Sequence, residues 1–272
     1  MTMSQNPEIP QPENKSTKLP FIILALLGLG LIGYCIFGAF TLLNPKQSAL
    51  ETENAAEVND QNSENELQNP SEDAQALIDE SAQWATVFEE TFDSNTNVNG
   101  WNMGEATTGE IESDLEIKDG KYVWDVTSKN KVTGILSPMT LSTVSDFRLS
   151  ADVKLTSGTY KPVYGVVFRD NPNGDGYFFG IYGETFLIDK YHSGSTTRFA
   201  ESQKTPAIRP QETNRLTVIA KDSFLVFLIN DQFVFEVVDE GIDQGTLGFG
   251  VTFFHVDLQN SFEFDNFIVK IP

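Results

Sequence analysis

An uninterrupted apolar segment, residues 20–43, constrains this chain more than any other feature of its sequence, because it contains no charged residue. Its length of about 24 residues suits the roughly 20 that a helix needs to cross a hydrocarbon core, and exceeds the roughly 7–15 of a cleavable signal. We therefore predict a transmembrane helix here, retained as an uncleaved signal anchor. It divides the chain into a tail (1–19), the helix (20–43), a linker (44–85) and a folded domain (86–272).

The charges that flank this segment predict its orientation. Lys15 and Lys18 precede it, whereas Lys46 is the only basic residue between it and the folded domain. Basic residues favour the cytoplasmic side. We expect a single-pass protein of the cell membrane, with its N-terminus in the cytoplasm and its domain outside. Two alternatives stay open: a signal peptide cleaved within residues 44–49, and a lipoprotein site at Cys35.

The linker is strongly acidic. It holds ten Asp and Glu residues against Lys46 alone, and few of its side chains are apolar enough to build a core. Low hydrophobicity combined with charge of one sign keeps a segment disordered and extended. The sequence therefore predicts a disordered stalk that holds the folded domain away from the bilayer.

The composition of the folded domain excludes several classes of function. The chain has a formal net charge of −21, and the domain lacks the clusters of Lys and Arg that nucleic-acid binding requires. The domain contains no cysteine, so disulfides cannot stabilise it. Its only histidines are His192 and His255, far apart in the sequence, which excludes the usual zinc sites.

Period-two patterning predicts that the domain consists of β-strands. Residues 147–155 alternate apolar and polar side chains, which places one face in a core and the other in solvent. Turn-forming residues separate the runs, and Asn230 and Asp231 fit a tight hairpin turn that needs positive φ. Many short strands with aromatic residues predict an all-β, two-sheet antiparallel jelly-roll sandwich. Further predicted strands are residues 86–92, 121–126, 160–168, 177–182, 186–191, 215–221, 224–229, 232–238, 248–254 and 262–271.

The order of short motifs resembles that of the concanavalin A-like lectin/glucanase superfamily. It is most similar to the bacterial branch that includes laminin-G-like modules and the 3-keto-disaccharide hydrolase domain. The resemblance covers nearly all of residues 86–272 and implies a jelly-roll fold. The motifs that carry it are residues 88–92, Trp101, and residues 115–122, 147–153, 164–170, 176–181, 227–233, 245–251 and 264–267.

Glucanases of this superfamily carry paired carboxylates on one strand, in an E-x-D-x-E pattern. One match exists, Glu112, Asp114 and Glu116, but it lies early in the domain rather than where the resemblance places a cleft strand. Leu115 and Ile117 supply the buried face there, so the acids read most simply as a solvated face. We therefore assign no catalytic residue.

The resemblance also implies a structural calcium ion. In laminarinase-like relatives, the last strand supplies a carboxylate and segments near the first strand supply further oxygens. The matching positions here are Asp265, Glu90 and the carbonyl of Gly120. Oxygen ligands of this kind suit Ca²⁺. The oxygen-rich loop at residues 170–176 is a second candidate, but its spacing favours an ordinary hairpin turn.

Sugar recognition uses aromatic platforms flanked by polar groups, and Tyr and Trp suit a wet face better than Phe. Alternation from residue 160 places Tyr164 toward the core and Arg169 on the exposed side. The expected ligand-binding residues are Trp101, Arg169, Tyr177, Tyr182, Tyr191 and His192.

These observations favour a non-catalytic module of a bacterial cell envelope that binds glycan or another surface polymer. Two alternatives stay open. One is a glycoside-acting hydrolase of the 3-keto-disaccharide hydrolase or glucanase type, and the other is a structural module whose partner is an envelope protein. The expected partners are the membrane, through one helix, and a glycan, but not nucleic acid.

Overall fold

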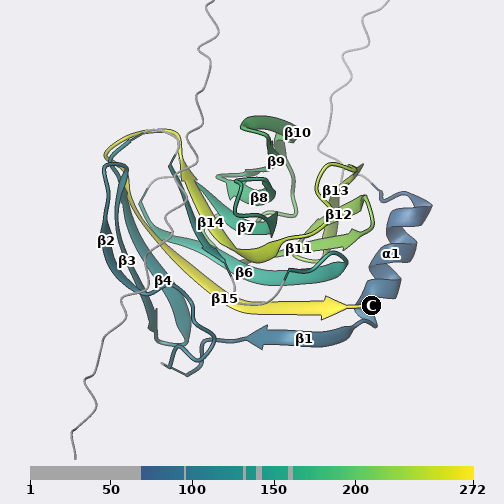
Figure 1. The fold of residues 1–272 in the computed structure, drawn as a ribbon, viewed down its shortest axis with the longest axis horizontal. Helices are drawn as coiled ribbons and strands as arrows, with labels where there is room; N and C mark the ends of the chain where they lie inside the picture. Colours follow the sequence, from purple (N-terminus) through teal and green to yellow (C-terminus); the bar gives the residue numbers. More distant parts are fainter. Residues whose placement is uncertain (1–68, 95, 131–132, 139–142, 159–161) are drawn as a thin grey trace, which may run out of the picture.

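The computed structural model describes residues 69–94, 96–130, 133–138, 143–158 and 162–272, and within them it contains one α-helix and fifteen β-strands (Figure 1). The elements are α1 (Glu72–Ala82), β1 (Ala85–Glu90), β2 (Gly104–Thr107), β3 (Ile111–Lys118), β4 (Lys121–Ser128), β5 (Thr133–Pro138), β6 (Phe147–Ser157), β7 (Pro162–Asp170), β8 (Gly176–Tyr182), β9 (Thr185–His192), β10 (Ser195–Lys204), β11 (Asn214–Lys221), β12 (Phe224–Ile229), β13 (Gln232–Val238), β14 (Thr246–Phe253) and β15 (Gln259–Ile271).

The strands form two antiparallel sheets. The nine-stranded sheet has the order β13-β12-β11-β6-β15-β4-β3-β2, with β1 paired to β15, and the six-stranded sheet has the order β10-β9-β8-β7-β14-β5. Strand β6 shows why these segments become strands: its apolar residues, from Phe147 to Leu155, are buried, and the polar residues between them are half-buried. The predicted antiparallel sandwich is confirmed.

Aromatic side chains fill the space between the sheets. The rings of Phe249 in β14 and Phe264 in β15 come from opposite sheets and lie 4.5 Å apart between centroids. Phe179 in β8 and Phe227 in β12 pack edge to face at 5.2 Å. Such pairs add to the area that each ring buries, so the aromatic-rich composition is explained by the core.

The hairpin turn predicted between β12 and β13 is confirmed. Asn230 and Asp231 have φ values of 51° and 64°, and Ile229 pairs with Gln232 across the turn. Two successive residues with positive φ give the turn a twist that matches that of the flanking strands.

The prediction that residues 44–85 form a disordered linker is wrong for its last part, because α1 begins at Glu72. Ser71 caps the helix, since its side chain accepts a hydrogen bond of 3.1 Å from the backbone N–H of Ala74. Glu72 and Asp73 add negative charge to the first turn, where the helix dipole favours it. Ala74 and Leu77 face inward and are buried.

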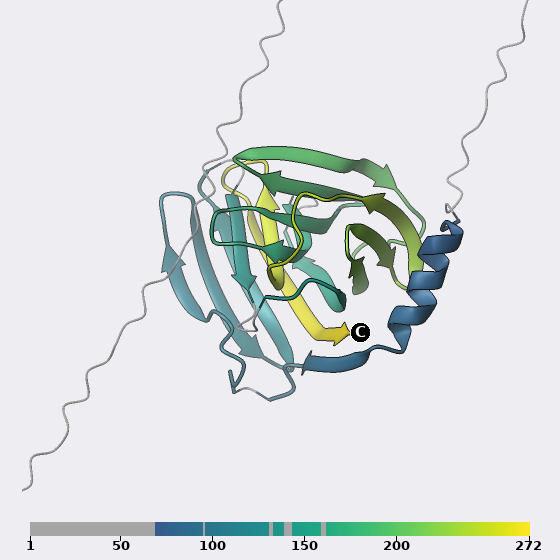
Figure 2. The same ribbon diagram turned by 45° about the vertical axis from the view of Figure 1, so that its right-hand side comes forward.

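Helix α1 packs on the side of the nine-stranded sheet that faces away from the core, at the end formed by β11 to β13. Figures 1 and 2 both place it on the side of the sandwich opposite β2, β3 and β4. The Lys270 ammonium donates to the carbonyl of Ala82 (2.8 Å), and Lys221 pairs with Glu80 (2.8 Å). The apolar contact joins Ala74, Leu77, Trp84, Ile219, Val226 and Leu228. The folded unit therefore begins before residue 86.

The predicted transmembrane helix over residues 20–43 and the linker up to residue 68 lie outside the described residues. Within the part of the chain that the structure describes, no helix has the length and apolar character needed to span a bilayer.

Candidate functional site

The six-stranded sheet carries apolar side chains on both faces. One face builds the core with Tyr164, Val166 and Phe168, and the other turns away from the nine-stranded sheet. On this outer face Val163, Val167, Phe178 and Leu187, which we call the apolar floor, are at most 3% exposed. Three partly buried rings, which we call the aromatic rim, pack against the floor: Tyr182, Tyr191 and Phe254.

Two facing glycines leave room for side chains of the apolar floor. Gly165 in β7 pairs with Gly180 in β8. A Cβ atom on Gly180 would lie 2.7 Å from Cγ1 of Val163 and 3.0 Å from Cζ of Phe178, so these side chains occupy the space that a larger residue would need. A larger residue at position 180 would therefore displace part of the apolar floor.

One ion pair lies on the same face. Asp189 in β9 and Arg198 in β10 are cross-strand partners, and the guanidinium donates from Nε and NH2 to the two carboxylate oxygens at 2.8 and 3.0 Å. Asp189 is 4% exposed, whereas 34% of the Arg198 side chain is exposed. Burial, with a contribution from Asp189, raises the pKa of the Tyr191 phenol above its usual value. The face thus combines partly exposed aromatic rings with a partly exposed ion pair, above a buried apolar floor.

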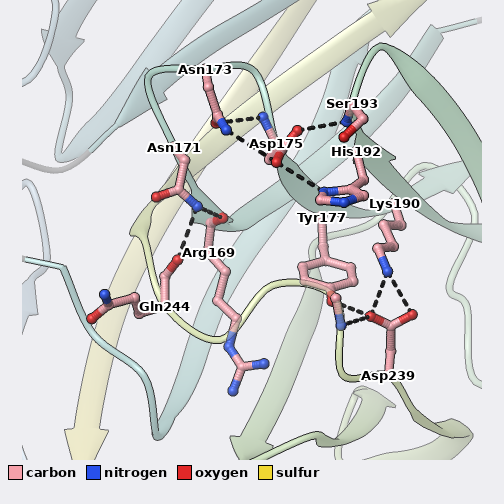
Figure 3. Close-up of polar contacts among 11 residues, drawn as sticks. Arg169, Asn171, Asn173, Asp175, Tyr177, Lys190, His192, Ser193, Asp239 and Gln244 are labelled. Carbon is pink, nitrogen blue, oxygen red and sulfur yellow. Dashed lines mark hydrogen bonds and ion pairs between the residues drawn. The ribbon is translucent and has the colours of Figure 1, made fainter.

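A separate polar corner joins the ends of β8 and β9 to the segment after β13 (Figure 3). The Tyr177 hydroxyl donates to Oδ1 of Asp239 at 2.7 Å, and the Lys190 ammonium donates to both oxygens at 2.7 and 2.9 Å. Burial raises the pKa of the Asp239 carboxyl, but hydrogen bonds from Lys190, Tyr177 and the Gly241 N–H outweigh it, so the pKa lies below its usual value. These contacts serve to hold the corner together.

The expectation that Arg169 is exposed is wrong. A register shift between Thr246 and Gly248 interrupts the pairing of β14 with β7, and Arg169 adopts a φ of 49°. A bulge of this kind re-aims a side chain, so simple alternation fails here. The guanidinium is fully buried, and it donates to the carbonyls of Ser145 (2.9 Å), Asp222 (2.6 Å) and Ile242 (2.8 Å).

Trp101 and Tyr177 also belong to the core rather than to a wet surface. Trp101 is 3% exposed and packs against Phe92 and Phe249, and Tyr177 is 1% exposed and stacks on Phe168 at 4.9 Å. Both are aromatic residues that the sandwich uses to fill its interior. The expectation that these two rings lie on a wet surface is therefore wrong, because both are buried in the core.

His192 lies at the exposed end of the β9–β10 hairpin. Its Nδ1 lies 2.9 Å from Oδ2 of Asp175, whose other oxygen accepts a 2.8 Å hydrogen bond from the Ser193 N–H. That N–H is the main cause that lowers the pKa of the Asp175 carboxyl. The oxygen-rich loop closes through backbone bonds between Asn171 and Asp175, which confirms the hairpin-turn interpretation.

Of the six expected ligand-binding residues, only Tyr182 and Tyr191 lie on the outer face. Sequence reasoning did not single out Asp189, Arg198, Phe254 or the apolar floor. A signal for part of this set existed, because alternation in β9 places Leu187, Asp189 and Tyr191 on one side once Phe186 and Ile188 are assigned to the core.

Two of the three residues expected to bind calcium, Asp265 and Glu90, already have polar partners. Asp265 pairs with Lys121, and its Oδ1 accepts a 2.8 Å bond from the Asn266 N–H. Glu90 accepts from the Phe92 N–H (2.9 Å) and from Asn99 (2.6 Å). Gly120 has a φ of 73° in the turn between β3 and β4.

Across the described ranges, no group of three or more His, Asp and Glu side chains is placed to hold a metal ion. The calcium site stays a prediction from the resemblance.

The E-x-D-x-E motif lies on a solvated face, as the sequence indicates. Glu112 and Asp114 are exposed, while Leu115 and Ile117, on either side of Glu116, are buried in the core. Glu112 pairs with Lys129 at 3.0 Å, and Glu116 pairs with Lys118 at 2.9 Å. The motif also lies on the nine-stranded sheet, whereas the apolar floor and aromatic rim lie on the six-stranded one.

Solved structures share this fold at low sequence identity. The catalytic domain of an endo-1,3-β-glucanase (laminarinase) from Thermotoga petrophila RKU-1 has a TM-score of 0.52 at 11% identity, covering 70% of this chain and 98% of that chain. A Bacillus subtilis protein with a galectin-like fold has a TM-score of 0.50 at 13% identity, and the match covers 69% of this chain and 96% of that chain. An endo-β-galactosidase from Clostridium perfringens has a TM-score of 0.52 at 12% identity, and the match covers 69% of this chain and 63% of that chain.

A search of curated proteins returned no match. A family model, in contrast, matches residues 86–269, which is more than half of the chain. The match spans every strand from β2 to β14, both sheets and the outer face. The chain therefore belongs to the family of 3-keto-alpha-glucoside-1,2-lyase-like domains.

Proposed function

We propose that this domain is a non-catalytic glycan-binding module, and that the outer face of the six-stranded sheet is its binding surface. The observation that carries the proposal is the aromatic rim of Tyr182, Tyr191 and Phe254, whose rings stay partly exposed above the buried apolar floor. Sugar rings present flat C–H faces that pack on such surfaces, while their hydroxyls need polar groups at the border. The Asp189–Arg198 pair supplies such groups.

The acids near this surface support binding over hydrolysis. Glycoside hydrolysis in most families needs two carboxyl groups across the scissile bond. In strands β7 to β10 and β14, the acids are Asp170, Asp189 and Glu201. Both oxygens of Asp189 accept hydrogen bonds from Arg198. The laminarinase and endo-β-galactosidase neighbours share the fold and make a carbohydrate ligand a natural candidate.

Binding of the purified full chain to a panel of polysaccharides and envelope fractions tests the proposal. We expect retention on at least one glycan, and a loss of affinity of about tenfold or more when Tyr182→Ala and Tyr191→Ala are combined, because each ring contributes about 1–2 kcal/mol of apolar contact. The matched control combines Tyr182→Phe and Tyr191→Phe, which keeps the rings and most of the binding. Retention on no glycan would favour the protein-interaction alternative.

The family name favours one further candidate, an enzyme acting on 3-keto-glucosides. Burial raises the pKa of the Asp170 carboxyl, at the end of β7, to about 6, which suits a proton donor near neutral pH. Release of a free sugar from a 3-keto-glucoside in the same incubations would establish this candidate over the first.

We also propose that the domain is displayed outside the cell membrane on the helix of residues 20–43. The support is the length of this uncharged segment and the lysines before it. Protease added to intact cells is then expected to remove the domain. Its survival in intact cells, with digestion only after lysis, would contradict this topology.

A further inference from the structure

Building on the proposed function, we infer that the outer face prefers uncharged glycans to acidic ones, and that Asp189 sets this preference by neutralising Arg198. Arginine is the side chain best suited to bind a carboxylate or sulfate through two parallel hydrogen bonds. Here Asp189 of the same domain already occupies that bidentate position.

The charges around the pair point the same way. Lys190 projects to the polar corner and pairs with Asp239, and Arg169 is buried away from the outer face, so neither compensates a ligand's negative charge there. Among the described residues, Lys204 is a further basic residue near the β8–β9 hairpin, and it pairs with Glu184. An acidic sugar therefore meets described basic side chains that are already paired with acids of the same domain.

The burial of Asp189 makes the effect local rather than a consequence of net charge. The carboxylate is 4% exposed and lies on the same side of β9 as Tyr191 and Leu187. A second carboxylate brought beside it would be repelled in a partly desolvated environment, where like charges interact more strongly than in water. Sugar hydroxyls, which are neutral and both donate and accept, meet no such repulsion.

The test compares the dissociation constants of a neutral glucan, laminarin, and an acidic glycan, polygalacturonate, for the full chain. We expect wild type to bind laminarin at least tenfold more tightly. Asp189→Asn removes the carboxylate that holds Arg198, and is expected to tighten polygalacturonate binding at least tenfold. Glu112→Gln makes the same change in net charge on the other sheet and is expected to leave the ratio of the two constants unchanged.

Folding of each variant is followed by thermal melting. Should Asp189→Asn fail to fold, combining it with Arg198→Gln removes both charges, and this double variant is expected to bind laminarin without gaining affinity for polygalacturonate. Wild type that prefers polygalacturonate, or a folded Asp189→Asn variant with an unchanged ratio, overturns the inference and leaves the proposed function standing. Wild type that binds neither glycan nor any other on the panel overturns the proposed function itself.

Discussion

Removing residues 1–85 is expected to destabilise the sandwich by about 3–5 kcal/mol and to lower its melting temperature by about 10 °C. The deletion takes away Leu77 and Trp84, which are 5% and 8% exposed in the intact structure. It also uncovers Ile219 and Val226, both fully buried against α1. Loss of the Glu80–Lys221 pair adds little, because both side chains are largely solvated.

Thermal and urea denaturation of matched chains measures this effect. The control lacks only residues 1–68, keeps Ser71 and all of α1, and is expected to unfold at the same temperature as the full chain. Equal stability of the two truncated chains would contradict the conclusion that α1 is part of the folded unit.

Replacing Arg169 with methionine is expected to cost about 3–5 kcal/mol of unfolding free energy. The change removes hydrogen bonds to the carbonyls of Ser145, Asp222 and Ile242, which join three segments at one end of the sandwich. The buried carbonyl of Ile242, left unpaired, costs about 1–3 kcal/mol, and the partly buried bonds to Ser145 and Asp222 add smaller losses. Relief from burying a charge offsets part of this, since burial lowers the pKa of the Arg169 guanidinium.

The matched control is Arg215→Met. Arg215 forms a bidentate pair with Asp152, at 2.8 and 3.0 Å, but its side chain is 40% exposed. Pairs of this exposure contribute about 1 kcal/mol or less. Chemical denaturation of both variants compares the two sites, and equal losses would show that the buried carbonyl network around Arg169 does not stabilise the fold as described.

Local patterning in the sequence predicts most of the fold. The alternation in β6 and the Asn230–Asp231 turn translate directly into the structure, because each depends only on neighbouring residues. The start signals of α1 were equally local: a capping serine at Ser71, acidic residues in the first turn, and apolar residues at Ala74 and Leu77. The acidic composition of the surrounding segment hid them.

Other elements lack a sufficient local signal. Strand β2 has only four residues, and β10 is a polar edge strand, so neither shows the alternation of a half-buried strand. Because β10 is not predicted from the sequence, the Asp189–Arg198 ion pair that joins it to β9 is not predicted either. The turn at Ser193 and Gly194, both with positive φ, places Asp189 opposite Arg198, and this register could be derived once the hairpin was assigned.

The outer face could not be separated from the core by patterning. Strands β7 and β8 are apolar on both sides, as in Val163 and Tyr164 or Phe178 and Phe179, so alternation divides each strand into two sets without showing which set faces the core. The prediction that Arg169 is exposed fails for a different reason. The register shift near this residue interrupts the alternation at the end of β7.

The affinity of the full chain for its best-binding neutral polysaccharide, measured for wild type and for the combined Tyr182→Ala and Tyr191→Ala variant, tests the binding surface most directly. We predict a loss of about tenfold or more in the folded alanine variant, and near wild-type affinity in the phenylalanine control. Equal affinities of the folded alanine variant and wild type would contradict the assignment of binding to the outer face of the six-stranded sheet.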